Sequence, residues 1–222
     1  MKMVKLLQLS GLIVMLAFIS ACRHKPKDGL TDTYTSGVIA IAADESFRPI
    51  VQEEIDVFEG LFPLAGIVPR YVTEVDAINL LLKDSLRLAI TSRRLTPEEM
   101  GAFNSRKFFP LEIKIATDGL ALITNRGNPD TLIGVKDLRR ILTGEAGQWK
   151  DIYPSSRLGD IHLVFDNKNS STVRFAVDSI AKGAPLSTRV KALKTNKEVN
   201  DYVARTPDAM GVIGVNWLSG RN

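Results

Sequence analysis

The chain has 222 residues, long enough for a sizeable core in one domain or in two small lobes. Its formal net charge is only +4, and the basic residues are scattered rather than clustered, which argues against nucleic-acid binding. Two histidines and one cysteine argue against a transition-metal site and exclude an internal disulfide, so we expect no metal and no cofactor.

The N-terminal 21 residues have the pattern of a secretory signal, with two lysines before an apolar run at 6–19. That run is shorter than the roughly 20 apolar residues of a membrane-spanning helix. It ends in ISAC, which resembles a bacterial lipobox, where the cysteine is lipidated and becomes the new N-terminus. We expect removal of 1–21, a lipid on Cys22 rather than an ordinary thiol, a flexible tether at 22–36, and a place in the bacterial cell envelope, facing the periplasm or exterior.

From Gly37 onward, short β-branched runs alternate with segments of helical periodicity, which predicts an α/β fold. The expected strands are 37–43, 66–72, 86–91, 161–165 and 209–218, with a long apolar stretch at 111–125. The expected helices are 44–62, 74–84, one starting near 96, 135–144, one starting near 170, and 197–206.

Individual residues allow more detailed predictions for three of these elements. Pro69 cannot donate to a ladder, so the strand at 66–72 should lie at an edge or carry a bulge. Thr96, Pro97 and Glu99 form a capping-box pattern at a helix start. The helix at 135–144 should be amphipathic, with one apolar side made by Val135, Leu138, Ile141 and Leu142.

Five separated segments resemble, in the right order, the PstS-type phosphate-binding proteins of ABC transporters. They are ADESFRPI (43–50), ITSRRLTPEE (90–99), DGLALITNRGNP with VKDLRRILTGEAGQWKDI (118–129 and 135–152), NSSTVRF (169–175) and DAMGVIGV (208–215). The resemblance covers essentially residues 37–218. It implies a type II periplasmic binding protein, in which two α/β lobes are joined by two crossing strands and the ligand lies between them.

On that resemblance, residues 37–117 plus 210–222 form lobe 1, and residues 118–209, including the crossing strand at 118–125, form lobe 2. More chain normally follows the return strand at 210–216 in this family. The sequence stops at Asn222, so we expect either a shortened member or an incomplete chain, with lobe 1 incomplete at its C-terminus.

Small polar residues gather at three strand-to-helix junctions, where α/β sheets bind ligands. Each residue alone could simply cap a helix, but together their hydroxyl and N–H groups could hold an anion. The resemblance places phosphate ligands on both walls of the cleft. The predicted phosphate-binding residues are Ser46, Thr91, Ser92, Arg93, Asp166, Asn169, Ser170, Ser171 and Thr172.

Two positions depart from the family pattern. Asp166 stands where the family usually has an arginine, and Arg93 follows Ser92 where the family tends to have an aspartate. We hypothesise that Arg93 donates to phosphate, while Asp166 pairs with Arg93 or accepts a proton from phosphate. The alternative is that Asp166 only caps the next turn and that Arg93 or Arg94 is solvated. Arg174, one turn into the helix, is a further candidate ligand.

The resemblance implies a monomeric lipoprotein that captures inorganic phosphate and delivers it to an ABC permease in the membrane, without catalysing a reaction. The alternatives are a receptor for sulfate, molybdate or tungstate, and a ligand-free scaffold or signalling lobe. A serine hydrolase is disfavoured, because the sequence has no G-x-S-x-G motif and His162 is the only histidine beyond the tether.

Overall fold

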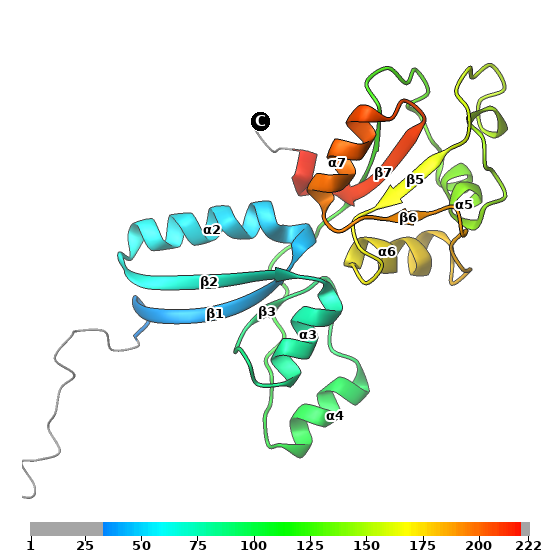
Figure 1. Ribbon diagram of the computed structural model, residues 1–222. Coiled ribbons are helices and arrows are strands. Elements are labelled where there is room, and N and C mark those ends of the chain that lie inside the picture. The colour runs from blue at the N-terminus through cyan, green and yellow to red at the C-terminus, as the bar shows by residue number, and fades with distance from the viewer. Residues whose placement is uncertain (1–32, 219–222) are drawn as a thin grey trace, which may run out of the picture.

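Two β-sheets, each with its own helices, form this protein in the computed structural model, which describes residues 33–218 (Figure 1). We call the three-stranded sheet with its helices the first lobe, and the four-stranded sheet with its helices the second lobe. The expected signal segment, Cys22 and the tether as far as residue 32 lie outside the described residues. Between residues 33 and 218, no helix has the length and apolar character to cross a membrane.

The first lobe is organised around β1, which lies in the sheet order β2-β1-β3 and is parallel to both neighbours. Successive side chains of β1 face opposite sides, so Ile41 packs with Val51 and Ile55 of α2, while Ala42 packs with Ala77 of α3. The elements are β1 (Ser36–Asp44), η1 (Glu45–Phe47), α2 (Arg48–Leu61), β2 (Leu64–Val72), α3 (Glu74–Leu82), β3 (Ala89–Ile90) and α4 (Pro97–Ser105).

Two local predictions in this lobe are confirmed. β2, which contains Pro69, is an edge strand of its sheet. Thr96 caps α4: its Oγ1 accepts from the Glu99 N–H at 3.2 Å, and its own N–H donates to Glu99 Oε2 at 2.8 Å. Pro97 occupies the first turn, where its missing N–H is not needed.

The second lobe has the strand order β4-β7-β5-β6. Its core contains the fully buried Trp149, packed with Leu138 and Leu142 of α5, and the indole N–H donates to the Asp208 carbonyl at 2.9 Å. The elements are β4 (Leu120–Thr124), α5 (Val135–Thr143), η2 (Trp149–Asp151), β5 (His162–Phe165), α6 (Ser171–Phe175), the π-helical η3 (Ala176–Ile180), β6 (Lys191–Ala192), α7 (Asn196–Arg205), β7 (Ala209–Gly214) and η4 (Val215–Leu218).

β7 is a central strand of the second sheet, parallel to β5 and antiparallel to β4, and all six of its residues are buried. The domain division expected from the sequence instead assigns residues 210–222 to the first lobe. Gly211 permits the close packing here, because an added Cβ would lie 2.7 Å from Val199 Cγ1 and 2.8 Å from Ile123 Cγ1. The chain touches the first lobe just after β7, where Trp217 Nε1 donates to the Ser46 carbonyl at 3.0 Å.

Some predicted elements differ from the structure. Val135, at the first position of α5, is 72% exposed, whereas Leu138, Ile141 and Leu142 are buried as predicted. The strand expected at 86–91 is reduced to β3. The apolar stretch 111–125 forms a strand only at β4, since no described strand pairs with residues 111–119. Three apolar side chains of that stretch are therefore exposed by 70% or more: Leu111, Ile113 and Ile115.

Candidate anion-binding site

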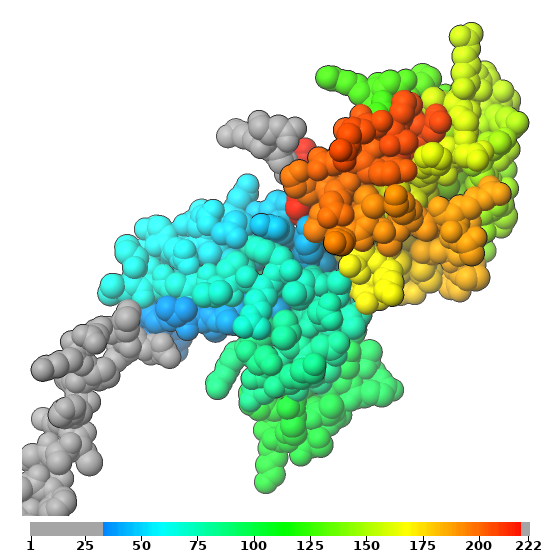
Figure 2. All heavy atoms as spheres, in the orientation of Figure 1, coloured from blue at the N-terminus to red at the C-terminus, as the bar shows by residue number. Residues whose placement is uncertain are grey.

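The candidate site lies where the two lobes touch, at the carboxyl ends of β1 and β5 (Figure 1). Asp44 is the last residue of β1, and Asp166 directly follows β5. Figure 2 shows the blue N-terminal part of the first lobe against the orange and yellow segments of the second lobe at this place. Ligands of α/β sheets commonly bind beyond the carboxyl ends of strands, which makes this junction the natural place for a site.

Asp166 is the centre of a buried hydrogen-bond network and is only 1% exposed. Its Oδ1 accepts from Ser170 Oγ at 2.7 Å and from Thr172 Oγ1. Its Oδ2 accepts from Asn196 Nδ2 at 3.3 Å and, across the lobe boundary, from Ser46 Oγ at 3.4 Å. The carboxylate thus fixes hydroxyl groups from both lobes around one point.

The polar loop before α6 both caps the helix and contributes to the network. Ser170 Oγ accepts from the Val173 N–H at 3.3 Å while it donates to Asp166. Ser171 Oγ reaches the opposite wall and donates to Ser46 Oγ at 3.4 Å. Asn169 does not join them: it is exposed, and its N–H donates to Asn167 Oδ1 at 3.0 Å.

Asp44 contributes a carboxylate oxygen with no partner. Its Oδ1 accepts from the Ser46 N–H at 3.0 Å and caps η1, whereas Oδ2 is buried without a hydrogen bond. Burial raises the pKa of this carboxyl, and the nearby charges of Glu74 and Asp166 raise it further, whereas the neighbouring Ser171 hydroxyl and the hydrogen bond from the Ser46 N–H lower it.

Glu45 lies beside it and faces α7. Its Oε2 accepts from the side-chain amide of Asn196 at 2.8 Å and from the Asn196 N–H at 3.2 Å, while Oε1 is buried without a partner. Burial raises the pKa of Glu45 to about 7, because the hydrogen bonds from Asn196 offset only part of the desolvation. The first lobe therefore contributes two carboxyl groups, those of Asp44 and Glu45, whose pKa values lie above their ordinary values.

A charged bridge joins α3 of the first lobe to α6 of the second. Arg174 Nε lies 2.7 Å from Glu74 Oε2, and Arg174 Nη2 donates to Ser92 Oγ at 2.6 Å. Ser92 also donates to Glu74, through its hydroxyl at 2.7 Å and its N–H at 3.0 Å. Burial alone would raise the pKa of Glu74, but the hydrogen bonds from Arg174 and Ser92 outweigh it and hold that pKa below its ordinary value.

The structure does not pair Arg93 with Asp166. Both terminal nitrogens of Arg93 donate to Glu99, each at 2.8 Å, and its Nε lies 3.8 Å from Glu74. Thr91 Oγ1 donates to the Arg93 carbonyl at 2.9 Å. Of the predicted ligands, the structure gathers Ser46, Asp166, Ser170, Ser171 and Thr172 in one network, places Ser92 beside Arg174, and leaves Thr91, Arg93 and Asn169 in other contacts.

Sequence reasoning did not single out four residues of this junction: Asp44, Glu45, Glu74 and Asn196. Asp44 and Glu45 adjoin Ser46 at the end of a predicted strand, which was a usable signal. Glu74 and Asn196 are the first residues of α3 and α7, and nothing in the sequence pattern marked them as part of a site. Among residues 33–218, no group of three His, Cys, Asp or Glu side chains forms a metal-ligand set.

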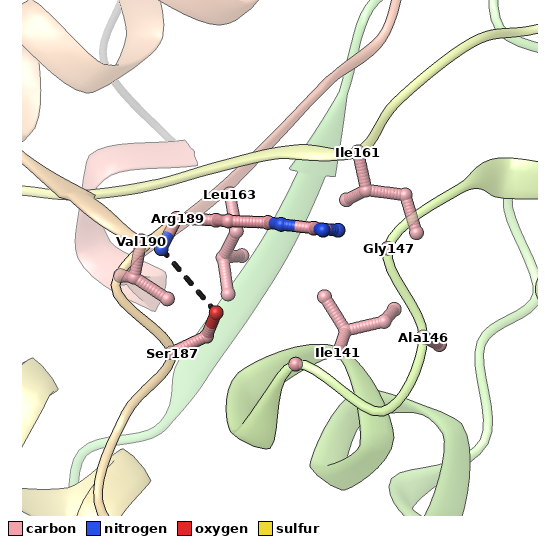
Figure 3. Close-up of a pocket in the computed structure, with 9 residues that line it drawn as sticks. Ile141, Ala146, Gly147, Ile161, Leu163, Ser187, Arg189 and Val190 are labelled. Atoms are coloured by element: carbon pink, nitrogen blue, oxygen red, sulfur yellow. Dashed lines mark hydrogen bonds between the residues drawn. The ribbon is translucent and has the colours of Figure 1, made fainter.

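A separate small pocket lies in the second lobe between α5 and the segment before β6 (Figure 3). Its lining is mostly apolar, and Arg189 extends across it toward Gly147 (Figure 3). An added Cβ at Gly147 would lie only 2.1 Å from Arg189 Nη1, so the arginine packs directly on the backbone there. We interpret this pocket as a packing feature of the second lobe.

The sequence matches the PBP superfamily domain over residues 30–221. It is 25% identical over 189 residues to the phosphate-binding protein PstS of Borreliella burgdorferi, a match that covers 81% of this chain and 64% of that protein. Protein SphX of Synechocystis sp. is 25% identical over 216 residues, covering 94% of this chain and 61% of SphX. The chain therefore spans less than two thirds of the length of these two relatives.

Solved structures show the same fold. One from Clostridium perfringens, described as a phosphate ABC transporter substrate-binding protein with bound phosphate, has a TM-score of 0.71 at 24% identity, over 81% of this chain and 71% of that one. An ABC-type phosphate transport receptor from Vibrio cholerae has a TM-score of 0.58 at 22% identity, over 83% and 73%. The predicted α/β fold is confirmed, and the chain belongs to the PBP superfamily.

Proposed function

We propose that this protein is an extracytoplasmic solute-binding lipoprotein that captures inorganic phosphate between its lobes and delivers it to an ABC permease, without catalysing a reaction. The observation that carries the proposal is the meeting of Ser46 from the first lobe with Ser171 and Asp166 from the second. A small oxyanion needs several fixed donors around it, and these hydroxyls come from both sides of one junction.

The hydrogen bonds that cross the lobe boundary differ in length. The two that involve the hydroxyl of Ser46, with Asp166 and with Ser171, are 3.4 Å long, whereas Arg174 binds Glu74 at 2.7 Å and Asn196 binds Glu45 at 2.8 Å. Long hydrogen bonds are weak. A phosphate ion would replace the two long hydrogen bonds of Ser46, while the loop before α6 keeps its shape. Closure of the lobes on the ion would then give the ligand-bound conformation that the permease recognises.

The relatives named above are described as phosphate-binding or phosphate-transport proteins, which favours phosphate over other oxyanions. We extend this ligand to the present chain as part of the proposal. The lipid on Cys22 and the monomeric state belong to it as well, and replacement of Cys22 by Ser should release the protein from the membrane fraction.

Isothermal titration with phosphate tests the proposal through Ser46→Ala and Ser171→Ala. Each change removes one hydroxyl that faces the junction, and a hydrogen bond to a charged ligand contributes about 1.5–3 kcal/mol, so affinity should fall roughly 10- to 100-fold. The matched control is Ser105→Ala, since Ser105 is exposed on α4 and donates only to the Ala102 carbonyl. Unchanged affinity in both variants would place the ligand elsewhere, and absence of any phosphate binding would refute the function.

A further inference from the structure

The carboxylate of Glu74 is surrounded by donors from both lobes. Its Oε1 accepts from the Ser92 hydroxyl at 2.7 Å and from the Ser92 N–H at 3.0 Å. Its Oε2 lies 2.7 Å from Arg174 Nε of the second lobe and 3.8 Å from Arg93 Nε of the first. Hydroxyl, backbone N–H and guanidinium groups are also the donors with which proteins bind small free anions.

Glu74 is a buried anion, whereas its donors can be reached from solvent. The Glu74 side chain is 2% exposed, the Arg174 side chain is 35% exposed, and Ser92 is exposed. Burial raises the pKa of Glu74, but the hydrogen bonds from Arg174 and Ser92 outweigh burial and hold that pKa below its ordinary value. Glu74 is therefore ionised at neutral pH and acts on its donors as a fixed negative charge.

Arg174 also lies next to the hydroxyls that we assign to phosphate. It follows Ser171 by three residues on α6, and residues three apart in a helix are neighbours on one face. Ser171 in turn donates to Ser46 of the first lobe at 3.4 Å. The charge of Glu74 acts on Asp44, the carboxyl at the same junction. An anion held by the two serines therefore lies close to the pair of Arg174 and Glu74.

We infer that Glu74 is an intramolecular competitor of phosphate: its carboxylate occupies Arg174 and Ser92 in the solute-free protein, and bound phosphate takes over these donors. The inference rests on the proposed function and adds the competition to it. The exchange requires no empty space beside Glu74, because phosphate oxygens take the place of the carboxylate oxygens as the side chain turns away. Arg174 then bridges the lobes through the phosphate instead of through Glu74.

The two anions compete on unequal terms. Phosphate has four oxygens and up to two negative charges near neutral pH, so it forms more charge-assisted hydrogen bonds than a carboxylate does. The carboxylate, however, is part of the chain and is always present at a high effective concentration. Glu74 therefore lowers the observed affinity for phosphate, and its removal should raise that affinity.

Titration calorimetry of the whole chain with inorganic phosphate tests the inference through Glu74→Gln. The variant keeps the size of the side chain but removes its charge, which weakens its hydrogen bonds from Arg174. We expect phosphate to bind roughly tenfold more tightly or better, the effect of one hydrogen bond to a charged group. A purely structural role for Glu74 predicts the opposite, because loss of the ion pair would then loosen the junction.

Asp178→Asn is the matched control. Asp178 also faces Arg174, at 3.8 Å from Nη1, but its side chain is 61% exposed and it belongs to the same lobe as Arg174. Exposed ion pairs between residues four apart contribute little, so the affinity for phosphate should change by about twofold or less.

A second variant keeps the inference testable if Glu74→Gln does not fold. Arg174→Ala removes the cation for which phosphate and Glu74 compete, so the affinity for phosphate should fall by roughly tenfold or more. The double variant Glu74→Gln with Arg174→Ala should likewise lose the gain expected from Glu74→Gln, since that gain depends on Arg174.

The outcomes separate this inference from the proposed function. Equal or weaker phosphate binding by folded Glu74→Gln, or unchanged binding by Arg174→Ala, overturns the inference and leaves the proposed function standing. Phosphate binding by Glu74→Gln, with none by the unmodified protein, supports the inference and overturns the function proposed for the unmodified protein. Absence of phosphate binding by both proteins overturns both.

Discussion

Asp166 makes different contacts from those that the sequence suggested. The sequence offered it as a partner of Arg93 or as a proton acceptor for phosphate. In the structure its two oxygens already accept from Ser170, Thr172, Ser46 and Asn196. We therefore propose that Asp166 mainly holds the hydroxyl groups in position.

Replacement of Asp166 by Asn should destabilise the protein. One carboxylate oxygen becomes an NH₂ group that faces the donors of its neighbours, and a buried unsatisfied polar group costs about 1–3 kcal/mol. We expect the melting temperature to fall by roughly 2–10 °C, measured by differential scanning calorimetry. Asp201→Asn is the control, since Asp201 pairs with Lys197 on the exposed face of α7. Equal melting temperatures for Asp166→Asn and the unmodified protein would contradict the central position of Asp166.

Glu45 should make stability depend on pH. Its pKa of about 7 in the folded chain lies above the ordinary value of 4.5, so folding takes up a proton between these two pH values. Its contribution is fully present below about pH 4.5 and is lost as pH rises through about 7. Denaturant titrations should show stability that declines across this range, and Glu45→Gln should reduce the decline. An identical pH profile for the variant would show that Glu45 ionises normally.

The sequence predicts a residue of the candidate site well when its place at the end of a strand determines where its side chain lies. It predicts less well when a hydrogen-bond or ion-pair partner determines this. Ser46, Ser170 and Ser171 follow strand ends, and the sheet topology brings such positions together. Arg93 was expected at the ligand, but Glu99 lies six residues away as part of a helix cap and binds both of its terminal nitrogens. A local partner of this kind competes with the ligand, and strand periodicity does not reveal it.

At the scale of elements, α3 and α6 are joined by Arg174 and Glu74 across the lobe boundary. The Glu74 side chain is only 2% exposed, so its charge is stabilised by hydrogen bonds from Arg174 and Ser92 rather than by water. Because the pKa of Glu74 is held below its ordinary value, this bridge stabilises the protein above the unfolded pKa of 4.5 and is lost as pH falls through the lower, folded-state pKa.

Removal of Arg174 should weaken the contact between the lobes. Arg174→Ala leaves Glu74 with the hydrogen bonds from Ser92 but without its closest cation, which we expect to cost about 1–3 kcal/mol in urea unfolding. Arg139→Ala is the matched control, because Arg139 is exposed on α5. If both variants unfold at the same urea concentration, the bridge contributes nothing to stability.

Residues 111–115 alternate between apolar and polar side chains, a pattern that favours a strand, yet no strand pairs with them among the described residues. Ile113→Ser should change the free energy of unfolding in urea by less than about 0.5 kcal/mol, since Ile113 is 70% exposed. A loss of stability above about 2 kcal/mol would indicate that Ile113 is covered in solution.

Element predictions succeeded where local chemistry determines the outcome. The capping box of α4 and the edge position of Pro69 follow from the hydrogen-bonding capacity of those residues. The short β3 and the unpaired part of 111–125 were not predictable, because strand formation depends on a partner strand that is distant in sequence. Val135 fitted the apolar periodicity of α5, but it begins the helix and lies outside the buried stripe.

The whole molecule consists of two lobes that touch through polar side chains rather than through a shared apolar core. The four hydrophobic clusters of the described residues each lie within one lobe. Relative motion of such units is the usual expectation when their interface is polar. This arrangement suits our proposal that an anion binds between the lobes and changes how they meet.

The most direct test of that proposal is a crystal structure of the protein grown with inorganic phosphate. We predict one phosphate ion at the lobe junction, with its oxygens within hydrogen-bond distance of Ser46 Oγ and Ser171 Oγ and close to the Asp44 carboxyl. Phosphate bound at another place, for example beside Arg189 in the second lobe, with the Ser46 and Ser171 hydroxyls still bonded to each other, would contradict the account.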